Sequence, residues 1–222
     1  ESLFRTSSAP LSGRLRVDMP SGLAKIVIQQ SLAEFLTAHP ELELELSSSD
    51  RRVDLIQEGF DCVVRVGALQ DSGLIARPLG KLQMVNCASP AYLQKYGCPQ
   101  NATELQSHQM VHYQNAQVGH SDRFEYVTAQ GDVQQVEMQG ALTVNSTESY
   151  SAACIAGLGI IQVPIIGVRH ALDTGTLVAI LPKLSPPAMP VSLLYPHRRN
   201  LARRVQVFMD WMSDIIRQQY VQ

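Results

Sequence analysis

The sequence predicts an α/β protein of two lobes that are joined by two crossing strands. Its 222 residues are many for one compact core and suit two small ones. Strand-like and helix-like apolar patterns alternate in two blocks, with a polar stretch at about 99–139 between them. The last strand and helix carry apolar faces that need a sheet to cover, and the first lobe supplies the most economical one.

The first lobe opens on a strand and a helix that meet at a proline corner. Residues 14–17 alternate arginine with an apolar residue, which is the period of a strand. Apolar residues then recur at helical spacing over 24–36. The corner between the two elements is formed by Pro20, Ser21 and Gly22.

A strand, a helix and a second strand are expected next. Leucines and glutamates alternate strictly over 41–46, which predicts a half-buried strand with a charged outer face. Residues 52–58 are predicted as a short helix that ends at Gly59, and residues 61–66 as a buried strand. This order is typical of a parallel sheet with crossover helices.

The second lobe is expected to begin with two extended segments, broken at Pro78 and Gly80, and a helix that opens at Ser89. The further predicted elements are a strand at 110–113, a hairpin at 123–140 turning at 130–132, strands at 141–144, 158–164, 177–181 and 191–196, helices at 145–157 and 165–175, and a closing helix with apolar positions over 201–215.

These elements divide the chain into a linker remnant and two lobes. Residues 1–12 are polar and irregular and are assigned to the linker. Lobe one is predicted to contain residues 13–84 and 190–222, and lobe two residues 85–189. Two such lobes enclose a cleft, and α/β proteins bind small molecules outside the carboxyl ends of their strands.

Composition excludes several classes of protein. Hydrophobic residues make up 45% and charged residues 17%, and no apolar run approaches the roughly 18 to 20 residues of a membrane span. No signal peptide is recognised. The net charge of -2 leaves no global excess of positive charge for nucleic acid. Four cysteines lie without C-x-x-C spacing, two of them in apolar runs, so we expect reduced thiols and a cytoplasmic location.

Four short stretches at the carboxyl ends of predicted strands are candidates for contact with a ligand. They are Pro20-Ser21-Gly22, Arg65-Val66-Gly67, Asn145-Ser146 and Val163-Pro164. Asn145 and Glu148 form an Asn-headed capping box, so Asn145 is predicted as a helix N-cap as well as a ligand contact. Ser21 has the same two interpretations.

Two further side chains at strand ends have alternatives. Arg65 interrupts an apolar strand, so its guanidinium must reach water, a ligand anion or a neighbouring acid in a structural salt bridge. Tyr195 offers a hydroxyl or stacking contact, or simply packs at the edge of a lobe.

Catalytic motifs are missing from the sequence. It contains no G-x-S-x-G elbow, P-loop, dinucleotide fingerprint or H-E-x-x-H motif. The six histidines show no metal-ligand spacing, so we expect neither a metal nor a cofactor. A cleft without a reacting group indicates a sensor or a carrier, not an enzyme.

Five segments in order resemble the effector-binding domain of LysR-type transcriptional regulators. They are "GRLRVDMPSGLA", "FDCVVRVGALQDSGLIARPLG", "CASPAYLQKYG", "VNSTESYSAACIAGLGIIQVP" and "HRRNLARRVQVFMDWM". The resemblance covers about residues 13–216. It implies two Rossmann-like subdomains of the type 2 periplasmic-binding-protein-like fold, with an inducer between them.

The resemblance also implies partners and a site. It implies a bacterial regulator that forms a homodimer through this domain and a tetramer in full length, and that contacts DNA only through an upstream winged helix-turn-helix. Family effectors are often small carboxylates or aromatic acids, and their site maps here onto Ser21, Gly22, Arg65, Gly67 and Asn145-Ser146.

Two rivals share this fold. A solute-binding protein of a transport system is the main alternative, and four unpaired-looking cysteines weigh against its export. An enzyme such as a lyase or dehydratase on the same scaffold is the second alternative. Turnover of a bound ligand by the purified chain would identify it.

Overall fold

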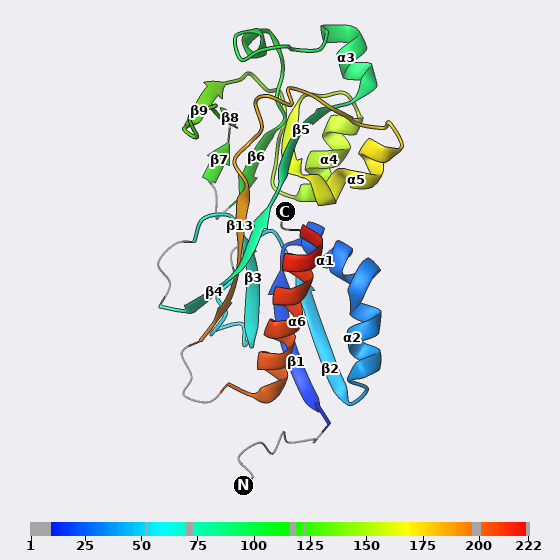
Figure 1. Ribbon diagram of the computed structural model, residues 1–222, viewed down its shortest axis with the longest axis vertical. Coiled ribbons are helices and arrows are strands. Elements are labelled where there is room, and N and C mark those ends of the chain that lie inside the picture. The colour runs from blue at the N-terminus through cyan, green and yellow to red at the C-terminus, as the bar shows by residue number, and fades with distance from the viewer. Residues whose placement is uncertain are drawn as a thin grey trace.

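The computed structural model describes residues 10–51, 53–69, 73–115, 119–121, 123–196 and 201–220. They form two lobes that are stacked along the long axis of the molecule (Figure 1). Lobe one contains the five-stranded sheet and the helices packed on it, and lobe two contains the remaining sheets and helices. The predicted fold, two α/β lobes joined by two crossing strands, is confirmed.

Lobe one is built on a mixed sheet with the strand order β2-β1-β3-β13-β4. Its strands are β1 (Gly13–Met19), β2 (Leu42–Ser48), β3 (Cys62–Val66), β4 (Ile75–Leu82) and β13 (Met189–Tyr195). β1 pairs in parallel with both β2 and β3, as the sequence predicted. β13 runs antiparallel between β3 and β4, so the returning strand completes the sheet of lobe one.

Charge pairs explain the outer face of the β1–β2 ladder. Leu15 lies beside Leu44 on the inner face, while the arginines of β1 lie beside the glutamates of β2. Glu45 forms ion pairs with both Arg14 and Arg16. Opposite charges on neighbouring strands favour this register, because a slip of one residue would bury the charged side chains.

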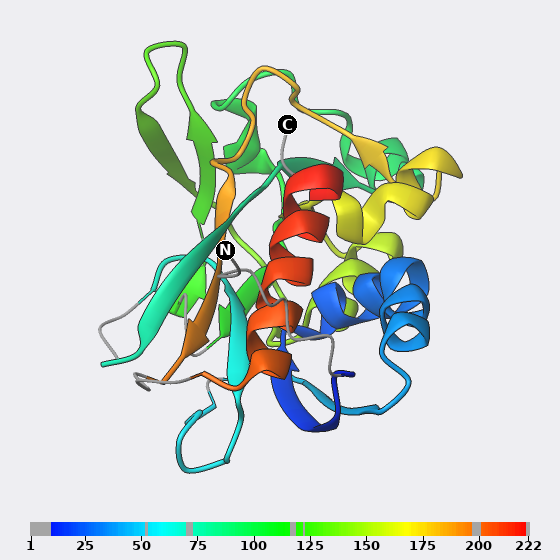
Figure 2. The same ribbon diagram turned by 60° about the horizontal axis from the view of Figure 1, so that its bottom comes forward.

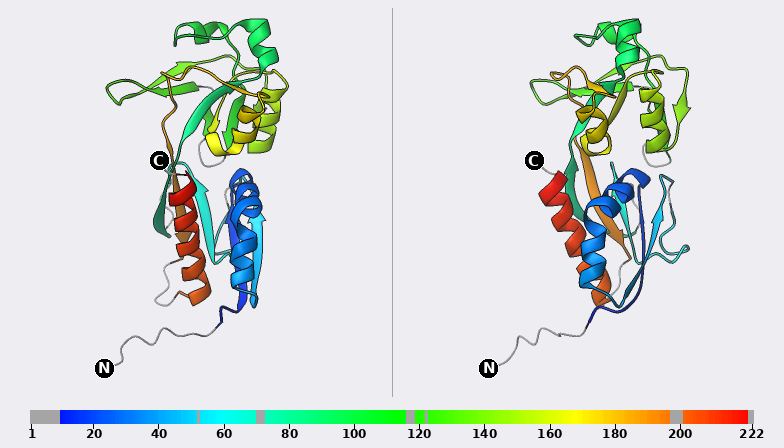
Figure 3. Two further views of the ribbon diagram at one scale, coloured as in Figure 1. Left: turned by 45° about the vertical axis from the view of Figure 1, so that its right-hand side comes forward. Right: turned by 90° about the vertical axis from the view of Figure 1, so that its right-hand side faces the viewer.

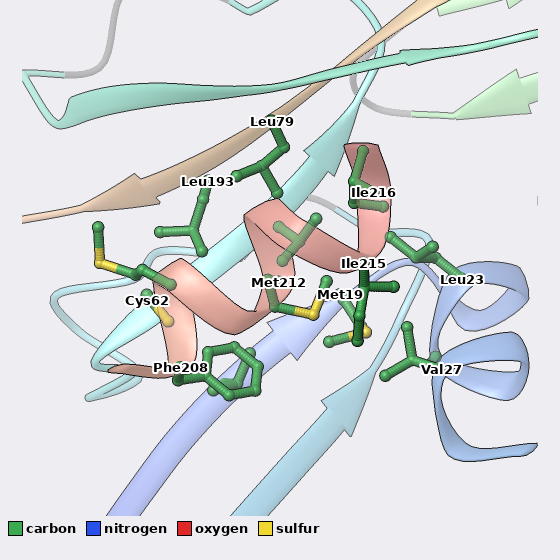
Figure 4. Packing of buried hydrophobic residues seen from close by; sticks show 14 of the residues in the cluster. Met19, Leu23, Val27, Cys62, Leu79, Leu193, Phe208, Met212, Ile215 and Ile216 are labelled. Atoms are coloured by element: carbon green, nitrogen blue, oxygen red, sulfur yellow. The ribbon is translucent and has the colours of Figure 1, made fainter. Parts of the chain in front are cut away.

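Helices cover one face of this sheet. They are α1 (Ser21–Val27), the π-helical turn η1 (Ile28–Leu32), α2 (Ala33–Ala38) and α6 (Arg203–Tyr220). Side chains of α6 point into a core shared with β1, β3 and α1 (Figure 4). Phe35 of α2 contacts the rings of Phe208 and Trp211 in α6, at centroid distances of 5.9 and 4.4 Å. The two helices therefore pack side by side.

The other face of the sheet is covered by a loop in place of the helix predicted at 52–58. That prediction is wrong for the described residues, since 55–59 form turns. The Asp54 carboxylate accepts the N–H groups of Ile56 and Gln57, and Glu58 accepts that of Asp54. Such local bonds compete with helix formation. Gly59 still ends the segment, with φ of 71°. Arg52 lies outside the described residues.

The described residues of lobe two form three small sheets and three helices. Its strands are β5 (Met84–Ala88), β6 (His112–Asn115), β7 (Gly119–Ser121), β8 (Arg123–Val127), β9 (Val133–Glu137), β10 (Thr143–Val144), β11 (Ile161–Pro164) and β12 (Val178–Ala179). Its helices are α3 (Pro90–Tyr96), α4 (Thr147–Ile155) and α5 (Ile165–Asp173), with a 3-10 turn η2 (Glu104–Ser107). Ser89 caps α3 through Tyr92 N–H, so the predicted start is confirmed.

The predicted hairpin is present as β8 and β9, which project from lobe two (Figure 2). Thr128 N–H donates to the Asp132 carbonyl at 2.8 Å and closes the turn. Gly131 has φ of 90° there, which glycine adopts without strain.

The chain passes between the lobes twice. β4 is continuous and leads to β5 through Gln83. The predicted break at Pro78 and Gly80 is therefore wrong: both residues lie within β4, which continues although its pairing register with β13 shifts between Val191 and Ser192. The second passage lies at 186–188, before β13. The lobe boundaries proposed from the sequence fall within two residues of these crossings and stay a prediction. Among the described residues, no helix is long and apolar enough to span a membrane.

Candidate functional site

Two helices from different lobes begin side by side where the lobes meet. α1 begins at Ser21, directly after β1, and α4 begins at Thr147, after β10. Both views of Figure 3 show the start of α1 facing lobe two. Gly22 permits this approach, because a Cβ there would lie 3.0 Å from the Thr147 Oγ1. Helix starts expose backbone N–H groups, so the junction gathers hydrogen-bond donors.

The carboxylate of Asp50 accepts these donors from both lobes. Its Oδ1 accepts the Ser21 N–H at 3.0 Å, and its Oδ2 accepts the Ser21 hydroxyl at 2.9 Å. Oδ2 also accepts the Thr147 N–H at 3.0 Å and the Thr147 hydroxyl at 3.5 Å. Charge-assisted bonds of this kind are stronger than neutral ones. One side chain therefore ties lobe one to lobe two.

The segment after β2 brings Asp50 to the junction. The Ser49 N–H donates to the Met19 carbonyl at 3.1 Å, and the Ser49 hydroxyl donates to Asp18 at 3.2 Å. These bonds hold the segment against the carboxyl end of β1, where α1 begins. The position of Asp50 thus follows from the parallel pairing of β1 and β2, whose register ends at Met19 and Ser48.

A pocket of about 790 Å³ lies beside this junction. Lobe one and lobe two both contribute to its lining, and all the described residues that line it are polar or charged. They are Ser21, Ser48, Ser49, Asp50, Arg51, Gln114, Asn145, Ser146 and Glu148. A space of this size accommodates a small molecule.

The charged groups of the pocket are largely paired. Arg51 forms a two-pronged ion pair with Glu58, at 2.9 and 2.5 Å. This hydrogen bond raises the pKa of Arg51 and lowers the pKa of Glu58. Glu148 lies 3.8 Å from Lys25 of α1, which is a second charged contact between the lobes. Both pairs are exposed to solvent, which screens their attraction.

Arg65 lies on the face of the sheet opposite α6, and its charge is compensated inside lobe one. Its Nη1 donates to Asp18 at 2.8 Å and to the Val64 carbonyl at 2.8 Å. The side chains of Arg65 and Asp18 are 6% and 0% exposed. Nη2 of Arg65 is buried with no hydrogen-bond partner among the described residues. The structural salt bridge is therefore the interaction that this arginine makes.

Comparison with known families identifies the chain. The family model of the LysR substrate binding domain matches residues 8–216. The chain belongs to the LysR substrate-binding domain family.

Relatives of this LysR domain are transcriptional regulators. The uncharacterized HTH-type regulator YhjC of Escherichia coli K12 is 49% identical over 98% of the chain and 73% of its own length. The activator AaeR of the same organism is 34% identical over 96% of the chain and 68% of its own length. The regulatory domain of CrgA, a LysR-type regulator from Neisseria meningitidis, superposes with a TM-score of 0.78 at 28% identity, covering 92% of this chain and 98% of that one.

These likenesses establish the class of function. The chain is the effector-binding domain of a LysR-type transcriptional regulator, with the periplasmic-binding-protein-like fold that the resemblance implied. The transport alternative is not favoured, because the relatives are regulators.

The structure brings part of the predicted site of the LysR domain together. Ser21, Asn145 and Ser146 line the pocket, and Pro20 and Gly22 flank Ser21. The remaining candidates lie outside the pocket lining: Arg65 in its ion pair, Val66 against the core of lobe one, Gly67 bonded to Pro190, Val163 in the core of lobe two, and Pro164 at the start of α5.

Tyr195 lies far from the junction. It ends β13, which runs antiparallel to β3, and Leu194 already pairs with Val63 near the amino end of that strand. The carboxyl end of β3, on the side of the pocket, is paired with Val191 instead. Tyr195 therefore packs at the end of the sheet that is opposite the pocket, against the core of lobe one.

Sequence reasoning missed much of the pocket. Residues 48–51, Gln114 and Glu148 line it, and Thr147 binds Asp50. The available signal was the stretch "SSSDR", polar residues directly after a strand predicted to lie parallel to β1. Because the carboxyl ends of parallel strands meet at one edge, this stretch belonged with the proline corner.

The N-cap of α4 is Ser146, so the prediction of Asn145 as the cap is wrong. The Ser146 Oγ accepts the Ser149 N–H at 3.2 Å. Ser21 is not a cap either, because α1 has Pro20 at the N-cap position without a side-chain bond, and the Ser21 hydroxyl donates to Asp50. The chain thus caps α4 one residue later than the capping-box pattern indicated.

Replacing the true cap tests this assignment. We expect Ser146→Ala to lower the free energy of unfolding by about 1 kcal/mol, because Ser149 N–H loses its acceptor. The matched variant Asn145→Ala should change it by less than about 0.5 kcal/mol. Urea unfolding of both variants gives the comparison, and a larger loss in Asn145→Ala would contradict the assignment.

The buried thiols of the LysR domain are unsuited to chemistry. Burial raises the pKa of Cys62, and contact with Cys87 raises the pKa of Cys154. Both therefore stay protonated, whereas nucleophilic cysteines need a lowered pKa. Among the described residues, no group of three or more histidines, cysteines or acids is placed to hold a metal.

Proposed function

We propose that a small-molecule effector binds in the pocket between the lobes and thereby controls transcription. The observation that carries this proposal is the lining of the pocket by residues from both lobes around the contact of Asp50 with Ser21 and Thr147. A ligand that touches both linings favours the lobe arrangement in which its contacts are best, and so shifts the equilibrium between arrangements.

The output of this shift is proposed to be DNA binding. A winged helix-turn-helix upstream of this domain contacts DNA, as the names of its helix-turn-helix relatives suggest. The effector domain itself carries a net charge of -2 and offers no excess of positive charge for a duplex. A regulator that acts on DNA in a bacterium works in the cytoplasm.

A pocket-blocking variant tests the effector site. We expect the wild-type chain to retain a small molecule from a bacterial metabolite extract, detected by native mass spectrometry. Asn145→Trp should lose that molecule, because the indole occupies the pocket. Gln130→Trp, in the exposed turn of the β8–β9 hairpin, is the matched control and should retain it. Equal retention by both variants would place the ligand elsewhere.

We also propose that the domain forms a homodimer, and a tetramer in the full-length regulator. The side of lobe one formed by α1, η1 and β2 is offered as the contact for α4 or α5 of the partner. Ile28 on η1 is 51% exposed, and Ile155 and Leu158 at the end of α4 are exposed as well. Burying such side chains between copies would stabilise the dimer.

Charge placed on this surface should weaken the dimer. We expect Ile28→Asp to raise the dissociation constant by about tenfold or more, because a carboxylate is costly to bury at an interface. Sedimentation equilibrium measures the change. Ile56→Asp, at a residue that is 70% exposed in the loop on the other face of the sheet, is the control and should leave the dimer intact. An unchanged dimer in Ile28→Asp would exclude this surface.

A further inference from the structure

We propose that Asp50 is a specificity-determining residue of the pocket: its carboxylate fills the place that a ligand carboxylate would take, so the pocket accepts effectors that donate hydrogen bonds instead. Hydroxyl, amide and ammonium groups are such donors. The inference rests on the proposed effector pocket and names the chemistry of its ligand. It departs from the small carboxylate that the family resemblance suggests.

Four donors at the junction bind Asp50. They are the N–H and hydroxyl of Ser21 and the N–H and hydroxyl of Thr147, at 2.9 to 3.5 Å from the carboxylate oxygens. A ligand carboxylate would have to displace Asp50 or lie beside it. Two carboxylates that share one site repel each other, and one of them must then take up a proton.

The rest of the lining favours donors in the same way. Asp50 and Glu148 contribute two negative charges, and Arg51 contributes one positive charge that Glu58 pairs. Lys25 is the cation near Glu148, at 3.8 Å. Adding these partners, Glu58 and Lys25, leaves the pocket with one net negative charge. No apolar residue is among the described lining residues, and the cation in the lining, Arg51, is already paired with Glu58, so an aromatic acid finds no cation without an acidic partner.

Asp50 faces the ligand space as well as the junction. It is only partly buried and lines the pocket, while its bonds cross from α1 in lobe one to α4 in lobe two. A donor group of the effector that approaches this carboxylate therefore meets the same atoms that hold the lobes together. Ligand selection and lobe geometry thus depend on one side chain.

Removal of the Asp50 side chain tests the proposal without knowledge of the effector. Asp50→Ala leaves a space shaped for a carboxylate and removes the acceptor of the Ser21 and Thr147 N–H groups and of their hydroxyls, which lie 3.2 Å apart and can then bond only to each other. We therefore expect the melting temperature of the 222-residue chain to fall by about 4 to 8 °C in sodium chloride. Sodium acetate at the same ionic strength should fill the space. With a dissociation constant of about 10 mM, about 100 mM acetate should restore about 3 to 5 °C.

Three controls separate filling of this space from general effects of acetate. The wild type and Asp173→Ala, at the exposed end of α5, should melt at equal temperatures in acetate and chloride. Asp50→Asn removes the charge but leaves no space, so acetate should not raise its melting temperature. If Asp50→Ala does not fold in chloride, the yield of folded chain after dilution from urea in each salt is measured instead, and acetate should raise it.

Two outcomes would overturn the proposal. One is an equal gain from acetate in Asp50→Ala and Asp50→Asn, which would place the anion elsewhere. The other is stabilisation of the wild type by acetate or benzoate as large as that of Asp50→Ala, which would show that Asp50 does not exclude carboxylates. Neither outcome bears on whether the pocket binds an effector, which the Asn145→Trp experiment decides separately.

Discussion

Replacing Arg65 by leucine is expected to lower the free energy of unfolding by about 3 to 5 kcal/mol. The change leaves the Asp18 carboxylate, which is 0% exposed, without its cation at 2.8 Å. An uncompensated buried charge is costly, whereas the leucine itself fits a sheet face that already carries Val63 and Leu194. Urea unfolding followed by circular dichroism measures the loss.

An exposed ion pair provides the control for this prediction. Arg77 pairs with Asp210 at 2.7 Å, but their side chains are 34% and 63% exposed, so Arg77→Leu should cost less than about 1 kcal/mol. The double variant Asp18→Leu with Arg65→Leu removes both charges and should recover much of the stability lost in Arg65→Leu. A loss in Arg65→Leu no larger than in Arg77→Leu would contradict the buried pair.

Replacing Phe208 by alanine is expected to lower the free energy of unfolding by about 3 to 5 kcal/mol. Phe208 is 0% exposed at the centre of the core of lobe one, where it contacts the rings of Phe35 and Trp211. Alanine leaves a cavity between α6 and α2 that the surrounding side chains fill only in part.

A smaller change at the same position separates packing from aromatic contact. Phe208→Leu keeps most of the volume and should cost less than half of the loss in Phe208→Ala. Chemical denaturation of the two variants gives the comparison. Equal losses would mean that the stabilisation by Phe208 comes from its ring contacts with Phe35 and Trp211, and not from the volume that it fills.

Most of the fold could be predicted because it rests on local periodicity. The structure contains β2 where leucine and glutamate alternate over 41–46, and it contains α6 where the apolar stripe predicted the last helix. The helix predicted at 52–58 failed for a reason that periodicity does not contain. There, Asp54 bonds the N–H groups of Ile56 and Gln57 and replaces the helical pattern by turns.

The site could be predicted only in part, because it depends on contacts that are distant in sequence. Ser21 and Ser146 follow predicted strands, and this alone placed them at the cleft. The bond from Thr147 to Asp50 spans 97 residues, and that from Arg65 to Asp18 spans 47. Nothing in the local pattern indicates that the buried Arg65 pairs with Asp18. Nor does it indicate that the Asp50 carboxylate occupies the place where an effector carboxylate was expected.

The place of β13 in its sheet sets the order in which the lobes can be completed. In the sheet, β13 lies between β3 and β4, and Met189 of β13 pairs with Leu82 of β4. The whole of lobe two is therefore inserted in the sequence between the neighbouring strands β4 and β13. A growing chain on the ribosome that ends before β13 leaves facing edges of β3 and β4 unpaired. Lobe two, although β1 to β4 of lobe one precede it in the sequence, can therefore finish folding first. Lobe one is completed only when β13 and α6 have been synthesised.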